Sequence, residues 1–269
     1  MNCGSPEEAT VALLIVTSER KFYLNLLILS LRLHKLRHID HVLVVDTSTV
    51  PRRWRGESFL RSSGRGYEVF NLPGTSVHQV LRTSWSHLAH NVGATHVLMF
   101  EEDFVLLKNL PIERLLALAN ENGTLQVVLP RQRWFEAEYA YPDRTTYLRA
   151  THDFLDTPEG DRLIGFFTNN PHCMSLERIL PLVEDVAPSD EYTWESSYAS
   201  ASAIHGMSSL QIRSSRPWVW HIGAATSLGA RAAVQVGRST WTVYPKAHAK
   251  RALVVIGRQV KQLLRGWKQ

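Results

Sequence analysis

Short apolar runs alternate with longer amphipathic segments through residues 11–130. Apolar runs that stop at polar or turn residues are typical of buried strands, and here they predict strands at 11–17, 41–46, 67–72, 95–100 and 125–129. Helices are expected at 20–36, from an N-cap at Ser76 to about Asn91 before Gly93, and from Pro111 to about Asn122, with a loop over 51–66. Buried strands that alternate with helices indicate an α/β fold, with a mainly parallel sheet covered by helices on both faces.

The periodicity weakens in the second half of the chain. Residues 131–165 carry aromatic side chains among charged ones and predict an irregular insertion or lid. Ser175 is expected to cap a helix that contains 178–183, the small-residue stretch 192–205 predicts another helix, and 218–221 is expected to be extended.

Length and composition favour one large domain. The 269 residues are 44% hydrophobic and 20% charged, which supports a sizeable core and excludes a disordered, collagen-like or coiled-coil protein. We expect a disordered N-terminus at 1–10, one large domain at 11–225 and a C-terminal extension at 226–269.

The sequence predicts a cytoplasmic protein. Its apolar runs are far shorter than the ~20 residues of a membrane span, and its polar start lacks the basic and apolar regions of a signal peptide. Cys3 and Cys173 provide no disulfide framework, so both are interpreted as free thiols in a reducing compartment.

The net charge of +5 arises from one segment. Residues 246–269 contain seven basic side chains and no acidic one, and removing them leaves 23 basic residues against 25 acidic ones. No basic stripe with interleaved aromatic residues runs through the rest of the chain, so we expect no nucleic-acid partner.

This basic segment predicts an amphipathic helix. At 100° per residue, one face collects the apolar residues Ala249, Leu253, Ile256, Val260, Leu263, Leu264 and Trp267. Two interpretations stay open: the face binds an anionic membrane surface, as at the inner membrane, or it packs on the catalytic domain or on a second subunit.

Three adjacent carboxylates, Glu101-Glu102-Asp103, directly follow the predicted strand 95–100. Such groups repel one another unless a cation offsets their charge, and carboxylate oxygens suit Mg²⁺ or Mn²⁺. Ligands of open α/β sheets bind beyond the carboxyl ends of the strands, which is where this triplet lies. The alternative is a solvated acidic turn.

The order of these motifs resembles a GT-A fold glycosyltransferase of the family-2-like group, of bacterial or phage type. Members have a polar-Arg turn after the first strand, a second strand that ends in Val-Val-Asp, and an acidic D-x-D motif after the fourth strand. Over about residues 11–225 the corresponding segments are Val16-Thr17-Ser18-Glu19-Arg20, Val44-Val45-Asp46-Thr47-Ser48 and Glu101-Glu102-Asp103. Glu101 departs from the usual Asp of the family, so Asp103 is the stronger candidate metal ligand.

The resemblance implies that 11–225 is a glycosyltransferase domain with a nucleotide-binding half (about 11–130) and an acceptor half (about 131–225), and it implies a role for each of these residues. Asp103, with Glu101, would hold Mn²⁺ or Mg²⁺ against the diphosphate of a nucleoside diphosphate sugar, a UDP-sugar in the first instance. The remaining residues implied in nucleotide-sugar binding are Thr17, Arg20, Asp46, Arg82 and Glu102. Arg20 and Arg82 also fit ordinary cations on a helix surface.

Four later residues complete the implied site. His221, in Trp-His-Ile-Gly, is similar to a late metal-ligating histidine of the family, although a lone histidine is often a packing residue. Glu195 is expected to be the catalytic base ahead of Glu191, Trp194 to stack on a sugar, and Asn170 to lie near the donor sugar. The alternative for Glu195 is a carboxylate favoured by the helix dipole.

The sequence thus predicts a metal-dependent glycosyltransferase that transfers a hexose to a glycan, lipid or protein acceptor, with inversion if a carboxylate base assists direct displacement. A nucleotidyltransferase that acts on a sugar phosphate is the first alternative, but it normally has a glycine-rich basic loop after strand one, and residues 17–21 lack glycine. A non-catalytic sugar-nucleotide-binding protein of the same fold is the second.

Overall fold

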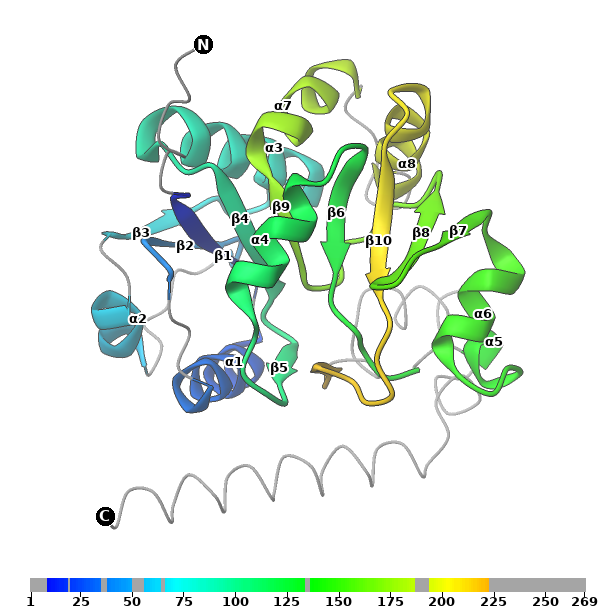
Figure 1. Ribbon diagram of the computed structural model, residues 1–269. Helices are drawn as coiled ribbons and strands as arrows, with labels where there is room; N and C mark the ends of the chain where they lie inside the picture. The colour runs from blue at the N-terminus through cyan, green and yellow to red at the C-terminus, as the bar shows by residue number, and fades with distance from the viewer. Residues whose placement is uncertain are drawn as a thin grey trace.

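The computed structural model describes residues 9–18, 20–34, 38–49, 56–63, 66–133, 136–186 and 194–222 (Figure 1). The predicted C-terminal helix lies outside these ranges, as do Cys3 and most of the predicted disordered N-terminus. Within the described residues, no helix combines the length and apolar character needed to cross a membrane.

One nine-stranded sheet runs through the described chain in the order β3-β2-β1-β4-β9-β6-β10-β8-β7, and a two-stranded sheet pairs β11 with β5. The strands are β1 (Val11–Thr17), β2 (His41–Asp46), β3 (Gly66–Asn71), β4 (His96–Glu101), β5 (Phe104–Leu106), β6 (Thr124–Val128), β7 (Phe154–Asp156), β8 (Gly160–Ile164), β9 (His172–Ser175), β10 (Ser208–Ile212) and β11 (Val219–His221).

Helices connect these strands. They are α1 (Lys21–Leu33), α2 (Glu57–Ser63), α3 (Val77–His87) with a π-helical extension η1 (Leu88–Val92), α4 (Ile112–Asn120), α5 (Glu136–Tyr139), α6 (Arg144–Thr151), α7 (Leu176–Asp185) and α8 (Trp194–Ile204). Gln79 N–H donates to the Ser76 hydroxyl at the start of α3, and Gly93 takes a left-handed conformation (φ 74°) after η1, which confirms the predicted start and stop.

The predicted α/β class with a mainly parallel sheet is confirmed. The four strands β3, β2, β1 and β4 pair in parallel, as do β6 and β10. Only β9 and β8 run against the other strands of the large sheet, so the carboxyl ends of β1, β2, β4 and β6 point to one edge.

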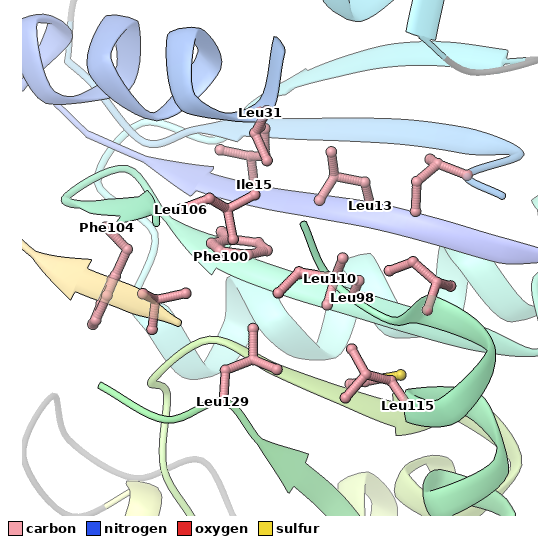
Figure 2. Packing of buried hydrophobic residues seen from close by; sticks show 14 of the residues in the cluster. Leu13, Ile15, Leu31, Leu98, Phe100, Phe104, Leu106, Leu110, Leu115 and Leu129 are labelled. Atoms are coloured by element: carbon pink, nitrogen blue, oxygen red, sulfur yellow. The ribbon is translucent and has the colours of Figure 1, made fainter. Parts of the chain in front are cut away.

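The core consists of two apolar layers, one on each face of the sheet. Helices α1, α2 and α4 cover one face, and α3, α7 and α8 cover the other (Figure 1). Alternate residues of a strand point to opposite faces, so Leu13 and Ile15 of β1 join the first layer, while Leu14 joins the second. Figure 2 shows the first layer, which includes Leu98 and Phe100 of β4, Leu31 of α1 and Leu115 of α4.

Two expectations for the connections were wrong, and one strand was missed. The predicted loop 51–66 contains the helix α2, and the predicted irregular insertion 131–165 contains α5, α6, β7 and β8. Strand β9, in the centre of the sheet, was not predicted at all. Its four residues, His172–Ser175, begin and end on polar side chains, so only its pairing with β4 and β6, which lie far away in sequence, makes it a strand.

Strand β8 approaches β10 most closely at Gly160. A Cβ atom added there would lie 2.1 Å from the backbone oxygen of Gln211. We therefore expect Gly160→Ala to lower the free energy of unfolding by about 1–3 kcal/mol, because the ladder must open to admit the methyl group. Chemical denaturation measures this, with Ile164→Val at the exposed end of β8 as a control expected to change stability by less than about 0.5 kcal/mol. Equal effects of the two variants would contradict the close approach.

Candidate functional site

The carboxyl ends of three parallel strands meet at one edge of the sheet. Thr17 at the end of β1 lies opposite Asp46 at the end of β2, and Val16 lies opposite Glu101 at the end of β4. The polar residues that stop each apolar run are therefore neighbours in space. This is the position where open α/β sheets bind ligands.

Thr17 and Asp46 are both buried and shape the turn after β2. The carbonyl oxygen of Thr17 accepts hydrogen bonds from the Thr47 N–H (2.9 Å) and hydroxyl (3.2 Å). Asp46 Oδ1 accepts one from the Ser48 N–H at 2.9 Å. These bonds hold Asp46 in place at the strand end, where the sequence predicts a nucleotide contact.

Arg20, just before α1, bridges two carboxylates of the acidic turn between β4 and β5. Its Nε donates to Glu102 Oε1 at 2.7 Å and its Nη1 donates to Asp103 Oδ2 at 2.8 Å. Both carboxylates are buried, whereas the Arg20 side chain is 22% exposed. Arg20, which is predicted to bind the nucleotide, therefore offsets the negative charge of the acidic turn.

The small sheet brings His221 to the same turn. Strand β11 pairs with β5 so that His221 lies opposite Phe104, and the two rings stack with centroids 4.6 Å apart. His221 Nε2 lies 2.9 Å from Asp103 Oδ2, and the Ile222 N–H donates to the Asp103 carbonyl at 2.7 Å. Gln132, after β6, exchanges two 3.0 Å hydrogen bonds with the backbone of His221. Asp103 and His221, two of the three predicted metal ligands, are thus in contact.

The carboxyl groups of Glu101, Glu102 and Asp103 differ in the direction in which their pKa is shifted. Burial acts to raise the pKa of Asp103, but His221 and Arg20 overcome it and hold that pKa below its ordinary value. Burial, together with the charge of Asp103, raises the pKa of Glu102 to about 7 and raises that of Glu101 well above its usual range. Asp103 is therefore the group that stays ionised.

The residues around Asp103 fit a divalent cation held mainly by a substrate. Asp103 Oδ1 is buried and has no hydrogen-bond partner among the described residues. Within the described chain, no group of three or more His, Cys, Asp or Glu side chains is arranged to hold a metal. Mg²⁺ is commonly bound through one or two protein carboxylates plus substrate phosphates and water, so Asp103 as a single protein carboxylate is compatible with it.

Glu101 belongs to a second group instead. The Asn169 side chain donates its Nδ2–H to Glu101 Oε1, and the Asn169 backbone N–H donates to Glu195 Oε1 at 2.6 Å. Oε1 of Glu101 therefore faces Asn169, whereas Asp103 Oδ1 has no hydrogen-bond partner among the described residues, so the metal role of Glu101 stays a prediction. Asn169 joins the end of β4 to the first turn of α8, and so places the predicted base Glu195 beside the strand-end carboxylates.

Glu195 is a half-buried carboxyl group with a raised pKa. Burial raises its pKa, and hydrogen bonds from Asn169 and Thr168 and the charge of Arg131 offset part of that effect. A carboxylate with a raised pKa is a stronger base than an exposed one, which is the property that general-base catalysis requires.

The structure places three other predicted residues differently. Trp194 is buried in the core against Phe167 and Tyr198, so its ring is not available to stack on a sugar. Asn170 turns its amide to the Thr168 hydroxyl (2.6 Å). Arg82 is exposed on α3, and no hydrogen bond or ion pair joins it to the acidic turn in the described structure.

A cavity of about 890 Å³ opens beside this site, and the sequence did not predict it. It lies beyond the carboxyl ends of β6 and β10 and is lined by segments that include Pro130–Arg133, Asp143–Thr146 and Gln211–Ser215, with Arg149, Asp156 and Trp220. Sequence reasoning also missed Asn169 and Gln132. The polar run Thr168-Asn169-Asn170 before Pro171 was the available signal for Asn169, and nothing local marks Gln132.

Arg20 provides a test of the acidic turn. We expect Arg20→Met to lower the free energy of unfolding by about 1–3 kcal/mol at mildly alkaline pH, because two buried carboxylates lose their cation. The pKa of Glu102 is about 7 with Arg20 in place, and Arg20 acts to lower it, so the loss of Arg20 raises this pKa further. Protonation of Glu102 removes its repulsion, and the variant therefore recovers part of its stability as pH falls from the alkaline side to about 7. Denaturant unfolding across this pH range measures the loss. A deficit independent of pH would contradict the charge explanation.

Comparison with known proteins is limited to fold. No family model and no curated protein matches the sequence. A crystal structure of 4-diphosphocytidyl-2C-methyl-D-erythritol synthase is similar with a TM-score of 0.45 and 12% identity, over 85% of this chain and 99% of that chain. A likeness at this level carries no argument about activity, so the activity must follow from the residues of the site.

Proposed function

We propose that this protein is a metal-dependent glycosyltransferase that transfers a hexose from a nucleoside diphosphate sugar, most simply a UDP-sugar, to an acceptor hydroxyl. The observation that supports it most is the pair of polar groups at one sheet edge. One group, Arg20, Asp103 and His221, suits a diphosphate, and the other, Glu101, Asn169 and Glu195, contains a carboxylate with a raised pKa.

In this proposal the first group binds the donor. Asp46 and Thr17 contact the base or ribose at the ends of β2 and β1, and Arg20 lies next to the diphosphate. Asp103 and His221 would hold Mn²⁺ or Mg²⁺, which supplies Lewis-acid stabilisation of the leaving diphosphate when bound. Arg20 pairs with Asp103 and Glu102 in the structure and offers its remaining N–H donors to phosphate oxygens.

Glu195 acts as general base in the proposed reaction. Its carboxylate takes the proton of the acceptor hydroxyl while the hydroxyl oxygen forms a bond to the anomeric carbon. The bond from that carbon to the diphosphate oxygen breaks, and its electron pair leaves with the nucleoside diphosphate. A single displacement of this kind inverts the anomeric centre. Asn169 orients both Glu195 and Glu101 through its two N–H donors.

A thermal-shift screen tests the proposal directly. UDP-, GDP- and dTDP-sugars are compared with and without Mn²⁺, and a ligand present at about 100 times its dissociation constant should add about 2.7 kcal/mol to the free energy of unfolding. Release of nucleoside diphosphate from the best ligand then establishes turnover. Release of pyrophosphate from a nucleoside triphosphate and a sugar phosphate would instead establish the nucleotidyltransferase alternative, and binding without turnover the non-catalytic one.

A further inference from the structure

The cavity beyond β6 and β10 is rich in guanidinium groups. Within the described chain it is lined by five arginines but only two carboxylates, Asp143 and Asp156. The arginines are Arg131, Arg133, Arg144, Arg149 and Arg213. They come from three separate parts of the chain, so only the fold brings them together.

Two of these arginines are neutralised locally. Arg149 binds Asp161 through Nε (3.0 Å) and Nη2 (2.6 Å), and Arg213 binds Asp161 (3.0 Å) and Asp156. Two cations therefore share two carboxylates. These arginines form the wall of the cavity but contribute no excess charge.

Arg133 has no such counter-charge. Its guanidinium lies 5.0 Å from the centre of the Tyr139 ring, and its Nη1 donates to the backbone carbonyl of Tyr141. No carboxylate is paired with Arg133 among the residues that the structure describes. Both contacts orient the group without removing its charge.

Arg144 is more than nine-tenths buried and incompletely bonded. Its Nη1 donates to the Gln211 side chain, and its Nε lies 3.4 Å from Glu138 Oε1, longer than a good N–H···O hydrogen bond. That buried Nε makes no hydrogen bond in the described part of the chain. Glu138 is shared with Arg131, which binds it at 2.7 Å and 3.1 Å. Burial and the neighbouring charge of Arg131 lower the pKa of Arg144 to about 9. The single carboxylate of Glu138 faces two guanidinium groups, those of Arg131 and Arg144.

We propose that this cavity binds a phosphate group carried by the acceptor, so that the substrate class is a phosphorylated hydroxyl compound. Guanidinium forks match phosphate oxygens in geometry and charge, and Arg133 and Arg144 are the two that need an anion. This inference rests on the proposed function, because it gives the acceptor a place beside the donor.

The cavity is also in the right place for an acceptor. Gln132 on its wall binds the backbone of His221, and Trp220, the residue before His221, lines it. A phosphate held by the arginines would therefore leave the rest of the acceptor near His221, at the sheet edge where the proposed base Glu195 also lies.

Binding of inorganic phosphate tests the site. Calorimetry is performed on the full chain saturated with UDP and Mn²⁺, so that phosphate cannot occupy the donor position. We expect Arg144→Gln and Arg133→Gln each to weaken phosphate binding about tenfold or more, the effect of losing one charge-assisted contact. Arg133 is partly buried, so its variant keeps the test valid if Arg144→Gln fails to fold.

The matched control is Arg162→Gln. Arg162 is on β8, is 15% exposed, bonds to Thr124 and Glu121, and does not line the cavity. Its loss should leave phosphate affinity unchanged. No phosphate binding by the wild-type chain, or equal loss in all three variants, would overturn the proposal.

UDP binding is measured first and phosphate binding is then measured on the UDP-saturated chain, so a failure of the proposed function is distinguished from a failure of the phosphate site. UDP binding without phosphate binding contradicts the phosphorylated acceptor and leaves the glycosyltransferase standing. Where phosphate binds, two competitors identify the source of the phosphate group. Displacement of inorganic phosphate by glycerol 3-phosphate indicates a soluble phosphate ester, and displacement by vesicles that contain phosphatidic acid indicates a lipid phosphate. Glycerol, which lacks the phosphate, should compete in neither.

Discussion

Asp103→Asn is expected to weaken binding of UDP in the presence of Mn²⁺ by about 100-fold or more, while the fold survives. Asp103 is the one carboxylate of the acidic turn whose pKa lies below its ordinary value, and its Oδ1 is buried without a hydrogen bond in the described structure. Changing a group that only orients a metal ligand costs 10- to 100-fold in metal affinity, and loss of the ligand itself costs at least as much. Isothermal calorimetry with UDP, with and without Mn²⁺, measures the change.

A carboxylate at the opposite end of the sheet provides the control. Asp40 Oδ2 accepts a hydrogen bond from the Val11 N–H at 3.0 Å, at the amino end of β1. Asp40→Asn should bind UDP and Mn²⁺ as the wild type does. If Asp103→Asn also binds both normally, then Asp103 is not a metal ligand and the acidic turn is purely structural.

Glu195→Gln should leave donor binding nearly intact and lower turnover by about 100-fold or more, which is the size of effect that loss of a general base has. Glutamine keeps the shape of the side chain and can still accept from the Asn169 N–H, but it cannot take a proton. Release of UDP from the donor, with water or an added acceptor as nucleophile, gives the rate. Unchanged turnover would move the catalytic role to another carboxylate.

The pH profile separates a base from a structural carboxylate. Burial raises the pKa of Glu195 above its ordinary value, so wild-type turnover should fall as pH decreases through that raised pKa, because only the ionised form accepts a proton. Glu195→Gln should lack this acidic limb. Glu113, which is in the first turn of α4 and 84% exposed, controls for a mere helix-dipole effect, and Glu113→Gln should keep both rate and profile.

Much of the fold follows from local features of the sequence. The apolar runs of β1, β2, β4 and β6 are buried on both faces, which is why they stand out in the sequence as continuous strands. Strands β1, β2 and β4 each end at a polar residue because the apolar core stops there, whereas β6 is followed by Leu129 and Pro130. The pattern of apolar runs is therefore sufficient to place Thr17, Asp46 and Glu101 at one edge of the sheet.

Other parts depend on contacts between distant segments. Strand β9 exists because β4 and β6 supply its partners, and β7 and β8 form on the edge beyond β10. Short strands with polar residues carry too little apolar periodicity to be recognised locally. These strands nevertheless complete the sheet beside which the cavity lies.

The α/β class, the edge of the sheet where the candidate site lies, and the carboxylates and histidine that are candidates for its chemistry could all be predicted from local sequence. The contacts between these groups depend on the tertiary structure: His221 lies against Asp103, Glu101 accepts a hydrogen bond from Asn169, and Trp194 lies in the core. The reason is physical. Where a strand ends is encoded by nearby residues, but the direction of a side chain and the identity of its partner depend on elements that pack against it from elsewhere in the chain.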